Sequence, residues 1–231
     1  MTAKFHRLFP SAIALALASF VSMPAFAAGG EHVVDDASVE TPGTCHLESW
    51  VTIHDSNSGL LNLSPACTRL EWPRLEIGGA YQHSWNGNAI NTLGPALKLN
   101  LRPEETGLGI GLITSGAVNL ASGKVESANL IVPVTIPIND LVRVNLNGGW
   151  TYARASVRQR AAFYGAQVEV QVARDFSLMG EVFGRDHGPA GGQAGLRWTP
   201  RNGPIDVDFV IGRRVDGTSP RSVSLGLTLR R

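Results

Sequence analysis

The sequence predicts an all-β protein: an antiparallel up-and-down transmembrane β-barrel of about 12 strands, or about 10 as the alternative. Three observations lead to this prediction. Apolar and polar residues alternate in many segments of strand length. Each segment is close to the ~9–11 residues with which a tilted strand crosses a bilayer. The chain begins with a secretory signal, and no later apolar run approaches the ~20 residues of a transmembrane helix.

Residues 1–27 are the predicted signal peptide. A basic start is followed by an apolar run over 13–21 and by the small-x-small cleavage site Ala25-Phe26-Ala27. The apolar run is too short for a membrane anchor, so we expect export with cleavage. Residues 28–43 contain Gly and acidic residues without any period, and they predict a flexible periplasmic leader. The barrel is expected to occupy residues 44–231.

Cys45 and Cys67 are the only cysteines, and in an exported chain they are expected to form a disulfide. A hairpin centred on Ser56 would place Cys45 opposite Cys67, with turn-forming residues 54–58 at its tip. Directly paired residues on antiparallel strands lie ~4.5–5.5 Å apart at Cα, which suits a disulfide. Two cysteines near His46 are too few ligands for a metal site, so we expect neither a metal nor a cofactor.

The predicted strands follow one another in order, separated by turns rich in Gly, Pro, Asn and Asp. They are 45–53, 60–68, 74–84, 92–102, 107–114, two strands within 129–152, and then 162–172, 176–185, 191–199, 204–212 and 222–230. Loops after odd-numbered strands tend to be longer or more charged than loops after even-numbered strands. Outer-membrane barrels have short periplasmic turns and longer outer loops, so odd strands are expected to run outward.

Residues 129–152 form the clearest hairpin. Even-numbered Leu, Val and Ile residues make one apolar face on both strands, which requires an even sum for paired positions. A two-residue Asn139-Asp140 turn would break that rule. We therefore predict an odd-length loop such as 138–140, or a bulge. The same parity predicts a three-residue turn at 173–175.

The apolar face is predicted to meet lipid. Its middle is rich in Leu and Val, whereas aromatic residues lie near strand ends, as in the interfacial girdles of membrane barrels. The predicted girdle consists of Tyr81, Trp150, Tyr152 and Tyr164 near the outer ends and Trp72, Phe176 and Trp198 near the periplasmic ends. The barrel must then close, because an open strand edge in hydrocarbon leaves backbone groups unpaired. A secreted or periplasmic all-β domain is the alternative.

The polar face would line the lumen and carries charges of both signs. The predicted lumen-lining residues are Arg74, Glu76, Lys98, Arg102, Arg143, Glu169, Glu181, Arg185, Arg197, Asp206 and Asp208. These charges either pair with one another and plug a narrow barrel, or line a path for a solute. Twelve strands fall between filled barrels of ~8 strands and open porins of ~16, so both interpretations stay open.

Two short motifs suggest chemistry. Gly107-x-Gly-x-Gly111 lacks the strand-to-helix context of a phosphate loop, and its glycines are interpreted as small residues facing a crowded lumen. His54-Asp-Ser56-Asn57 resembles the catalytic stretch of outer-membrane lipid A deacylases and phospholipases, which would make His54 the base and Ser56 the nucleophile. Turn composition explains the same residues. No catalytic residue is therefore predicted, and a lipid-modifying hydrolase is a distant alternative.

The mature chain resembles Gram-negative outer-membrane β-barrel proteins, including small transporter-like barrels, in its signal segment, its amphipathic strands and its closing Leu225-x-Leu-x-Leu229. The resemblance implies an outer-membrane location, with lipid, lipopolysaccharide and the outer-membrane assembly machinery as partners. The implied function is a channel or transporter for small solutes, and a structural or adhesive barrel with a plugged lumen is the alternative. Such barrels commonly end in an aromatic residue, whereas this chain ends in Arg230-Arg231.

Charge excludes one class of partner. The whole chain has a net charge of +1, and removing Lys4 and Arg7 with the signal segment subtracts two, giving −1. Nucleic-acid-binding proteins carry basic patches or an overall positive charge, so no nucleic-acid partner is expected.

Overall fold

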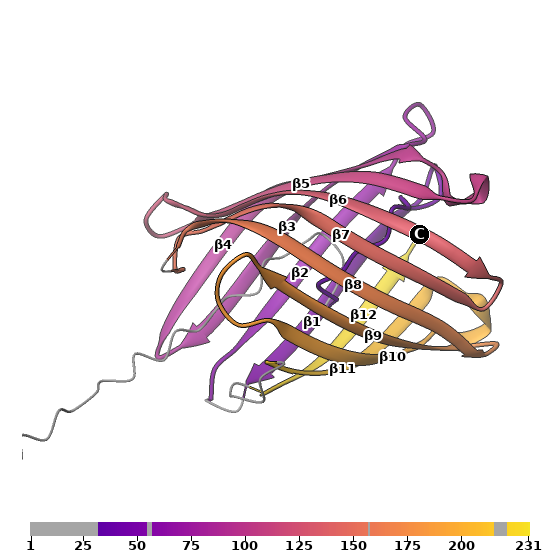
Figure 1. Ribbon diagram of the computed structural model, residues 1–231. Coiled ribbons are helices and arrows are strands. Elements are labelled where there is room, and N and C mark those ends of the chain that lie inside the picture. The colour runs from indigo at the N-terminus through magenta and orange to yellow at the C-terminus, as the bar shows by residue number, and fades with distance from the viewer. Residues whose placement is uncertain (1–31, 55–56, 157, 215–220) are drawn as a thin grey trace, which may run out of the picture.

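The computed structural model describes residues 32–231 except 55–56, 157 and 215–220. In these residues, twelve antiparallel strands form one closed barrel in which neighbours in sequence pair and β12 pairs with β1 (Figure 1). The strands are β1 (Cys45–His54), β2 (Gly59–Thr68), β3 (Leu75–Asn86), β4 (Asn88–Arg102), β5 (Gly109–Asn119), β6 (Val125–Asn139), β7 (Val142–Ala153), β8 (Arg160–Ala173), β9 (Phe176–Arg185), β10 (Gly191–Trp198), β11 (Ile205–Arg214) and β12 (Arg221–Arg230). Two single 3-10 turns, η1 (Glu104–Thr106) and η2 (Pro200–Asn202), connect strands. The predicted barrel of twelve strands is confirmed.

The predicted signal peptide, residues 1–27, lies outside the described residues. Within the described ranges, no helix is long and apolar enough to cross a membrane.

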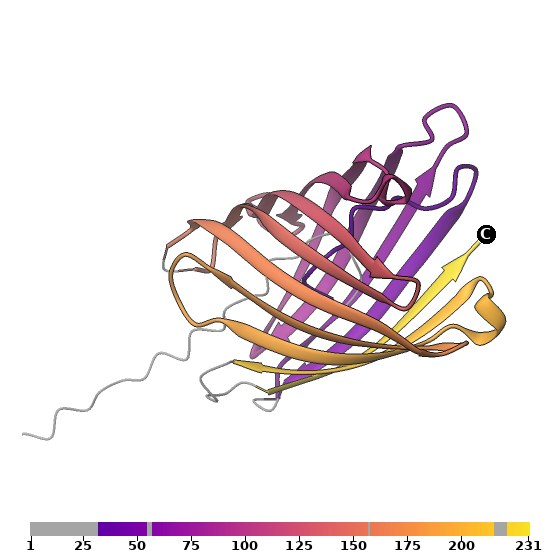
Figure 2. The ribbon, with the colours of Figure 1, turned by 45° about the vertical axis from the view of Figure 1, so that its right-hand side comes forward.

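The two ends of the barrel differ in what they hold. At one end the barrel begins and finishes: Cys45 N donates to Arg231 O and Arg231 N donates to Cys45 O, both at 2.8 Å. This end, called the termini end below, also holds the tight connections at 140–141 and 174–175. The opposite end, called the loop end, holds Gly87 between β3 and β4 and the connection 120–124. Figure 2 shows the strands wound obliquely between the two ends.

Alternation along each strand gives the barrel an apolar outside and a polar inside. Leu225, Val182 and Phe209 point outward and are 60%, 53% and 48% exposed. Ser224 and Asp208, on the opposite face of the same sheet, are buried inside. Water-soluble proteins rarely expose a contiguous apolar patch larger than a few hundred Å², and here exposed large apolar side chains lie on the outer wall of every strand except β2. This distribution fits a barrel surrounded by lipid.

The β1–β2 hairpin has the predicted register. Cys45 pairs with Cys67, and Ile53 pairs with Gly59. The two cysteines form a disulfide, with their Cα atoms 4.0 Å apart. The predicted pairing is therefore confirmed.

Parity explains two turns at the termini end. In the β6–β7 hairpin, Val134 pairs with Leu146 on an even sum, and the register shifts between Pro137 and Asn139. The predicted bulge is confirmed. The prediction of a three-residue turn at 173–175 is wrong, because Ala173 pairs directly with Phe176 and a register shift just before Ala173 preserves the parity instead.

Strand boundaries at the loop end differ most from the prediction. β5 and β6 extend through the predicted polar loop 115–125, leaving only residues 120–124 between them. β3 and β4 meet at Gly87, whose φ of 74° suits glycine. Polar residues can extend β5 and β6 at this end because their side chains face the lumen. Ser115, for example, faces the lumen and pairs with Asn129. The predicted contrast in loop length between the two ends therefore holds only in part.

Leu146→Arg tests which face of the wall meets lipid. Leu146 lies mid-strand on β7, points outward and is 40% exposed. We expect the unfolding free energy in lipid vesicles to fall by about 2–4 kcal/mol, because an arginine near the bilayer midplane is costly. Leu141→Arg, at the 56% exposed turn of the same hairpin, is the matched control and should cost about 0–1 kcal/mol. Equal effects of the two variants would argue against a lipid-facing wall.

The described part of the predicted leader lies inside the barrel instead of outside it. Residues 32–40 run inside the barrel, where Val34 is 2% and Ala37 is 1% exposed. The prediction of a flexible periplasmic leader over 28–43 is therefore wrong for this part. The physical reason is that wall side chains bind its backbone and its charges.

Candidate functional site

Residues 32–40, called the lumen segment below, form the site together with the inner wall of the barrel. Glu181 accepts hydrogen bonds from Val33 N at 3.0 Å and from Val34 N at 2.9 Å, one with each carboxylate oxygen. Asn147 binds Asp35 twice: its Oδ1 accepts from Asp35 N at 2.9 Å, and its Nδ2 donates to Asp35 O at 2.7 Å. A segment without regular secondary structure needs other partners for its backbone groups. Here the wall supplies them.

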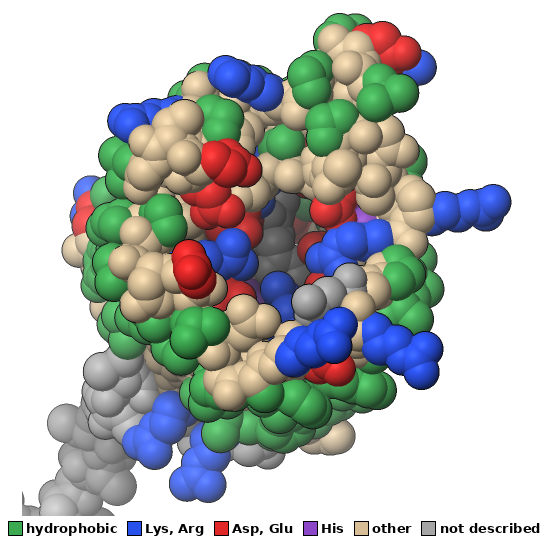
Figure 3. Space-filling model, turned by 90° about the vertical axis from the view of Figure 1, so that its right-hand side faces the viewer, with side chains coloured by type: hydrophobic (Ala, Val, Ile, Leu, Met, Phe, Trp, Pro, Cys, Tyr) green, Lys and Arg blue, Asp and Glu red, His purple; other side chains and the backbone are tan. Residues whose placement is uncertain are grey.

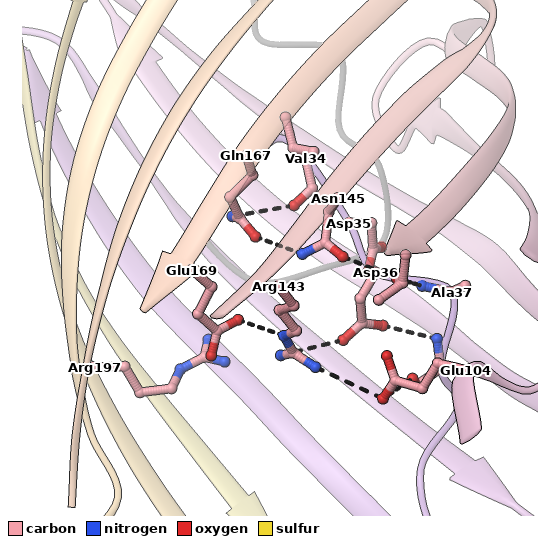
Figure 4. A network of polar contacts seen from close by, with 12 residues as sticks. Val34, Asp35, Asp36, Ala37, Glu104, Arg143, Asn145, Gln167, Glu169 and Arg197 are labelled. Carbon is pink, nitrogen blue, oxygen red and sulfur yellow. Dashed lines mark hydrogen bonds and ion pairs between the residues drawn. The ribbon is translucent and has the colours of Figure 1, made fainter. Parts of the chain in front are cut away.

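A row of uncharged polar side chains on β6, β7 and β8 continues this contact (Figure 4). Ala37 N donates to Thr135 Oγ1 at 2.9 Å, and Thr135 Oγ1 donates to Asn145 Oδ1 at 2.8 Å. Asn145 Nδ2 donates to Gln167 Oε1 at 2.8 Å, and Gln167 Nε2 donates back to Val34 O at 3.4 Å. The row therefore begins and ends on the lumen segment, and its amides are held in fixed orientations.

Lys98 on β4 binds the two neighbouring carboxylates of the lumen segment. Its Nζ lies 2.7 Å from Asp35 Oδ1 and 3.0 Å from Asp36 Oδ1. The Lys98 and Asp35 side chains are only 10% and 6% exposed. A buried charge without its partner is strongly destabilising, so this cation and these two acids depend on one another.

Arg143 on β7 contacts the lumen segment, the neighbouring strand β8 and the η1 turn (Figure 4). Its Nε donates to Glu169 Oε2 at 2.8 Å, and its terminal nitrogens lie 3.7 Å from Asp36 Oδ2 and 3.9 Å from Glu104 Oε1. Burial raises the pKa of the Glu104 carboxyl above its ordinary value, and the positive charge of Arg143 opposes that shift. The arginine thus connects β8, the lumen segment and the η1 turn.

Glu40 fixes the lumen segment near the termini end. Arg230 Nε donates to Glu40 Oε2 at 2.6 Å, and Arg230 Nη2 donates to Asp206 Oδ2 at 2.7 Å. Glu40 N donates to Glu76 Oε2 at 2.9 Å. Glu40 therefore connects two strands that are far apart in sequence, β3 and β12.

An apolar cluster on the inner wall holds the other end of the lumen segment. Val33 packs with Ile113, Ile131 and Phe163, which are all buried, and Phe183 covers the cluster. Burying a valine side chain contributes on the order of 1.5–3 kcal/mol. Apolar packing and polar contacts thus act on the same segment.

Glycines of the inner wall make room for the segment. A Cβ at Gly165 would lie 2.7 Å from Val34 Cγ2, and a Cβ at Gly195 would lie 2.7 Å from His32 Cε1. Gly111, from the glycine motif of β5, would place a Cβ 3.3 Å from Ala37 Cα. These close approaches give Gly111, Gly165 and Gly195 a packing role. The interpretation of small residues facing a crowded lumen holds for Gly109 and Gly111 of the glycine motif, whereas a Cβ at Gly107, whose φ is 103°, would meet open space.

The structure places most predicted lumen-lining residues inside the barrel. Those inside are Glu76, Lys98, Arg143, Glu169, Glu181, Arg197, Asp206 and Asp208. They form pairs across neighbouring strands: Arg143 with Glu169, and Arg197 with Asp208 at 2.8 Å. Glu181 instead binds the backbone of the lumen segment.

Two predicted lumen arginines lie outside the lumen. Arg74 is exposed in the turn before β3. Arg102, at the end of β4, folds onto the η1 turn, where its Nε donates to Thr106 Oγ1 at 3.0 Å. Their positions at strand ends let these two long side chains reach neighbouring connections instead of the lumen. Arg185 faces inward at the loop end: it pairs with the buried Phe163 on β8, and its Nε donates to the buried Thr151 Oγ1 at 3.0 Å.

The predicted girdle residues divide between the two ends, with one exception. Phe176 and Trp198 stack at the termini end with ring centroids 6.5 Å apart, and Trp72 lies exposed in the nearby β2–β3 turn. Trp150, Tyr152 and Tyr164 lie toward the loop end of β7 and β8. Tyr81 lies near the middle of β3, not at its outer end, and its hydroxyl donates to Asn91 Oδ1 at 2.8 Å.

A cavity of about 250 Å³ remains between the lumen segment and the wall of β1 to β6. Within the described ranges, no group of three or more His, Cys, Asp or Glu side chains is arranged to hold a metal ion. Ser56, the nucleophile of the distant hydrolase alternative, lies outside the described residues. The cavity and the segment beside it are therefore the candidate functional site.

Sequence reasoning missed the lumen segment and did not single out the uncharged polar residues of the inner face that bind it. One signal was present: Asp35, Asp36 and Glu40 of the leader complement cations that alternation already assigned to the lumen. Trp50 and Gln82 were also missed. Both fall on the inward face of their strands by the same alternation.

Comparisons with known proteins agree on the fold. A family model described as "Uncharacterised conserved protein UCP029691" matches residues 16–231. No curated protein matches the chain. A KdgM porin structure is similar with a TM-score of 0.63 and 9% identity, over 80% of this chain and 98% of that one. A NanC porin structure has a TM-score of 0.61 and 8% identity, over 79% and 98%.

A third structure is described as the COG4313 outer membrane channel from Pseudomonas putida F1. It has a TM-score of 0.57 and 11% identity, over 85% of this chain and 98% of that one. Another KdgM porin structure is described as a complex with disordered oligogalacturonate. At these identities the similarity establishes the fold alone, which is the fold of outer-membrane porins and channels.

Proposed function

We propose that this chain, which belongs to the family of uncharacterised conserved protein UCP029691, is an outer-membrane channel for small solutes that carries its own N-terminal segment in the lumen. The apolar outer wall supports a location in lipid. The termini end would face the periplasm, as in barrels with short periplasmic turns. Membrane lipid, lipopolysaccharide and the outer-membrane assembly machinery are the partners that this proposal requires. The proposed activity is transport, not catalysis.

The cavity beside the lumen segment is the observation that carries the proposal. About 250 Å³ stays unfilled beside the segment, mostly against the inner wall of β1 to β6. Figure 3 looks into the termini end and shows a hollow surrounded by acidic and basic side chains. The segment is held by hydrogen bonds, ion pairs and apolar packing, all of which are reversible. A displaced segment would widen the path.

The same contacts favour a second candidate function, a structural barrel that the lumen segment permanently plugs. The two candidates predict different behaviour when the segment is absent. A channel needs a continuous polar path along the lumen from one end of the barrel to the other. A structural barrel needs only its outer surface and its closed sheet.

Planar-bilayer recordings of a chain lacking residues 32–40 test the proposal. We expect current steps several-fold larger than those of the intact mature chain, because the deletion removes backbone and side chains from inside the barrel. Added peptide corresponding to residues 28–43 should reduce the current again. The same peptide with Asp35→Asn and Asp36→Asn should block less well, because it cannot pair with Lys98.

Heat-modifiable migration on mild-detergent gels shows whether each chain is folded. A folded barrel without residues 32–40 that gives no current steps would establish the structural barrel and remove the channel. Current steps of equal size with and without the segment would show that the segment does not occupy the conducting path.

A further inference from the structure

Four side chains on the inner face of β1 to β4 form one continuous row across the cavity wall. Trp50 pairs directly with Asn62, Asn62 pairs with Gln82, and Gln82 pairs with Thr92. Directly paired residues of antiparallel strands have Cβ atoms about 4.5–5.5 Å apart. All four residues line the cavity. The row therefore combines an indole, two amides and a hydroxyl on a rigid sheet.

Small neighbours leave space beside this row. Trp50 faces Gly226 on its other side, so the indole has no side chain opposite it on β12. The next inward positions toward the termini end include Ser64 and Ala80, which also line the cavity. The resulting volume of about 250 Å³ lies just below the ~300–1,000 Å³ typical of pockets for drug-sized ligands. It suits a solute of the size of one sugar ring.

Gln82 brings an unsatisfied polar group to this space. It is 8% exposed, and its Nε2 is buried without a hydrogen-bond partner among the described residues. A buried donor without a partner costs free energy, so this amide favours any molecule that offers it an oxygen. The neighbouring Asn62 amide donates to Ser64 Oγ at 2.7 Å, which leaves Gln82 as the open donor of the row.

The charges around the cavity disfavour anions. The cavity-lining acids are Asp35, Asp36, Glu40, Glu48, Glu76 and Glu169, and the cavity-lining lysine and arginines are Lys98, Arg143, Arg197 and Arg230. Each of these four bases already lies in an ion pair with a carboxylate. An anionic solute would therefore have to displace a carboxylate or approach the acids that remain.

We propose that the row formed by Trp50, Asn62, Gln82 and Thr92 is a binding site for an uncharged, hydroxyl-rich solute of monosaccharide size. This inference rests on the proposed channel function and names its class of solute. The indole offers an apolar plane to the C–H face of a sugar ring. Hydroxyl groups both donate and accept, so they satisfy the amides of Asn62 and Gln82 and the hydroxyl of Thr92. Few polar groups on a rigid, largely enclosed wall are typical of small-molecule sites.

A series of three ligands tests the class of solute without any variant. Isothermal titration calorimetry of the full mature chain in detergent is carried out with D-glucose, D-glucuronate and D-glucosamine, which share one ring and differ in charge. We expect glucose to bind and glucuronate to bind about tenfold more weakly or not at all, because the bases around the cavity are already paired. Tighter binding of glucuronate than of glucose, or glucosamine binding more than about tenfold tighter than glucose, would overturn the proposal.

Two variants test the position of the site. Gln82→Leu should weaken glucose binding about three- to tenfold, the size expected for one hydrogen bond. Trp50→Ala should weaken it by about tenfold through loss of the ring contact. The matched controls are Gln171→Leu, near the end of β8, where the Gln171 amide donates to Arg174 O, and Trp150→Ala, on the outward face of β7. Both controls should leave glucose binding unchanged.

Failure of this inference differs from failure of the proposed function. If the chain lacking residues 32–40 conducts but the mature chain binds no glucose, the channel stands and the solute class is wrong. If glucose binds with equal affinity to Gln82→Leu, Trp50→Ala and the unchanged chain, this row is not the site. Heat-modifiable migration of each variant shows that the barrel is intact.

Discussion

Lys98→Met is expected to release the lumen segment while leaving the barrel intact. The substitution keeps the length of the side chain but removes the cation that lies 2.7 Å from Asp35 and 3.0 Å from Asp36. Breaking a buried ion pair by removing one partner costs about 3–5 kcal/mol, and two adjacent carboxylates would then repel one another. Leaving the lumen relieves this cost, because water can solvate both acids.

A thiol placed in the segment measures its release. Both natural cysteines form the disulfide, so Val34→Cys adds a single thiol at a position that is 2% exposed. In Lys98→Met this thiol should react with maleimide on the order of 100-fold faster, which corresponds to about 3 kcal/mol. Lys124→Met, in the exposed loop 120–124, is the matched control and should leave the rate unchanged.

A rescue variant separates the ion pair from a general disturbance. Adding Asp35→Asn and Asp36→Asn to Lys98→Met removes the unpaired carboxylates, so the maleimide reaction should slow again. A rate in Lys98→Met equal to that of the parent chain would mean that the ion pair does not hold the segment. A triple variant as fast as Lys98→Met would assign the effect to lost packing of the lysine stem.

Removal of the disulfide is the change expected to affect the stability of the barrel most directly. Cys45 and Cys67 are 22 positions apart, and closing a loop of that size in the unfolded chain stabilises a protein by about 3 kcal/mol. We expect Cys45→Ser with Cys67→Ser to lower the unfolding free energy by about that amount in urea titrations of the barrel in lipid vesicles. The double variant should still close its sheet, because the β1–β2 ladder does not depend on the sulfurs.

Reduction provides the internal control. Dithiothreitol should lower the urea midpoint of the parent chain to that of the double serine variant and should not change the variant itself. An unchanged midpoint in the double variant would show that the disulfide does not restrict the unfolded chain, and so does not stabilise the barrel.

The strands were predictable because one face of each meets a different solvent from the other. Because one face of the sheet meets lipid and the other meets polar groups, apolar and polar residues alternate along each strand. This alternation can be recognised in any strand of sufficient length. The same parity predicted the bulge before Asn139, since an odd register would have turned Val134 and Leu146 to opposite faces. It could not distinguish a three-residue turn from a two-residue turn with a bulge. Both turns keep paired residues on the same face of the sheet. In the structure, residues 174–175 form a two-residue turn, and the bulge lies between Gln171 and Ala173.

The lumen segment was not predictable from the pattern of residues 28–43. Its contacts use backbone groups, and Glu181 binds Val33 and Val34 through their N–H groups, which every residue other than proline has. Such recognition leaves no period in the sequence. The complementary charges of Asp35, Asp36 and Lys98 were visible in the sequence. However, the alternation of residues within strands does not show whether a segment before the first strand contacts the inside of the barrel. For the same reason the sequence could not show that Arg74 and Arg102 lie at the rim.

The lumen segment is joined covalently to the wall that it covers. Residues 41–44 lead directly into β1, and their base is fixed where Gly43 N donates to Thr68 O at 2.7 Å and Thr68 N donates to Thr44 O at 3.0 Å. A ligand on so short a tether meets its site at a high effective concentration, set by the tether and not by the amount of protein. Blocking by this segment should therefore be a first-order event within one molecule. A competing solute of equal affinity must exceed that local concentration, and dilution of the protein cannot unblock the path.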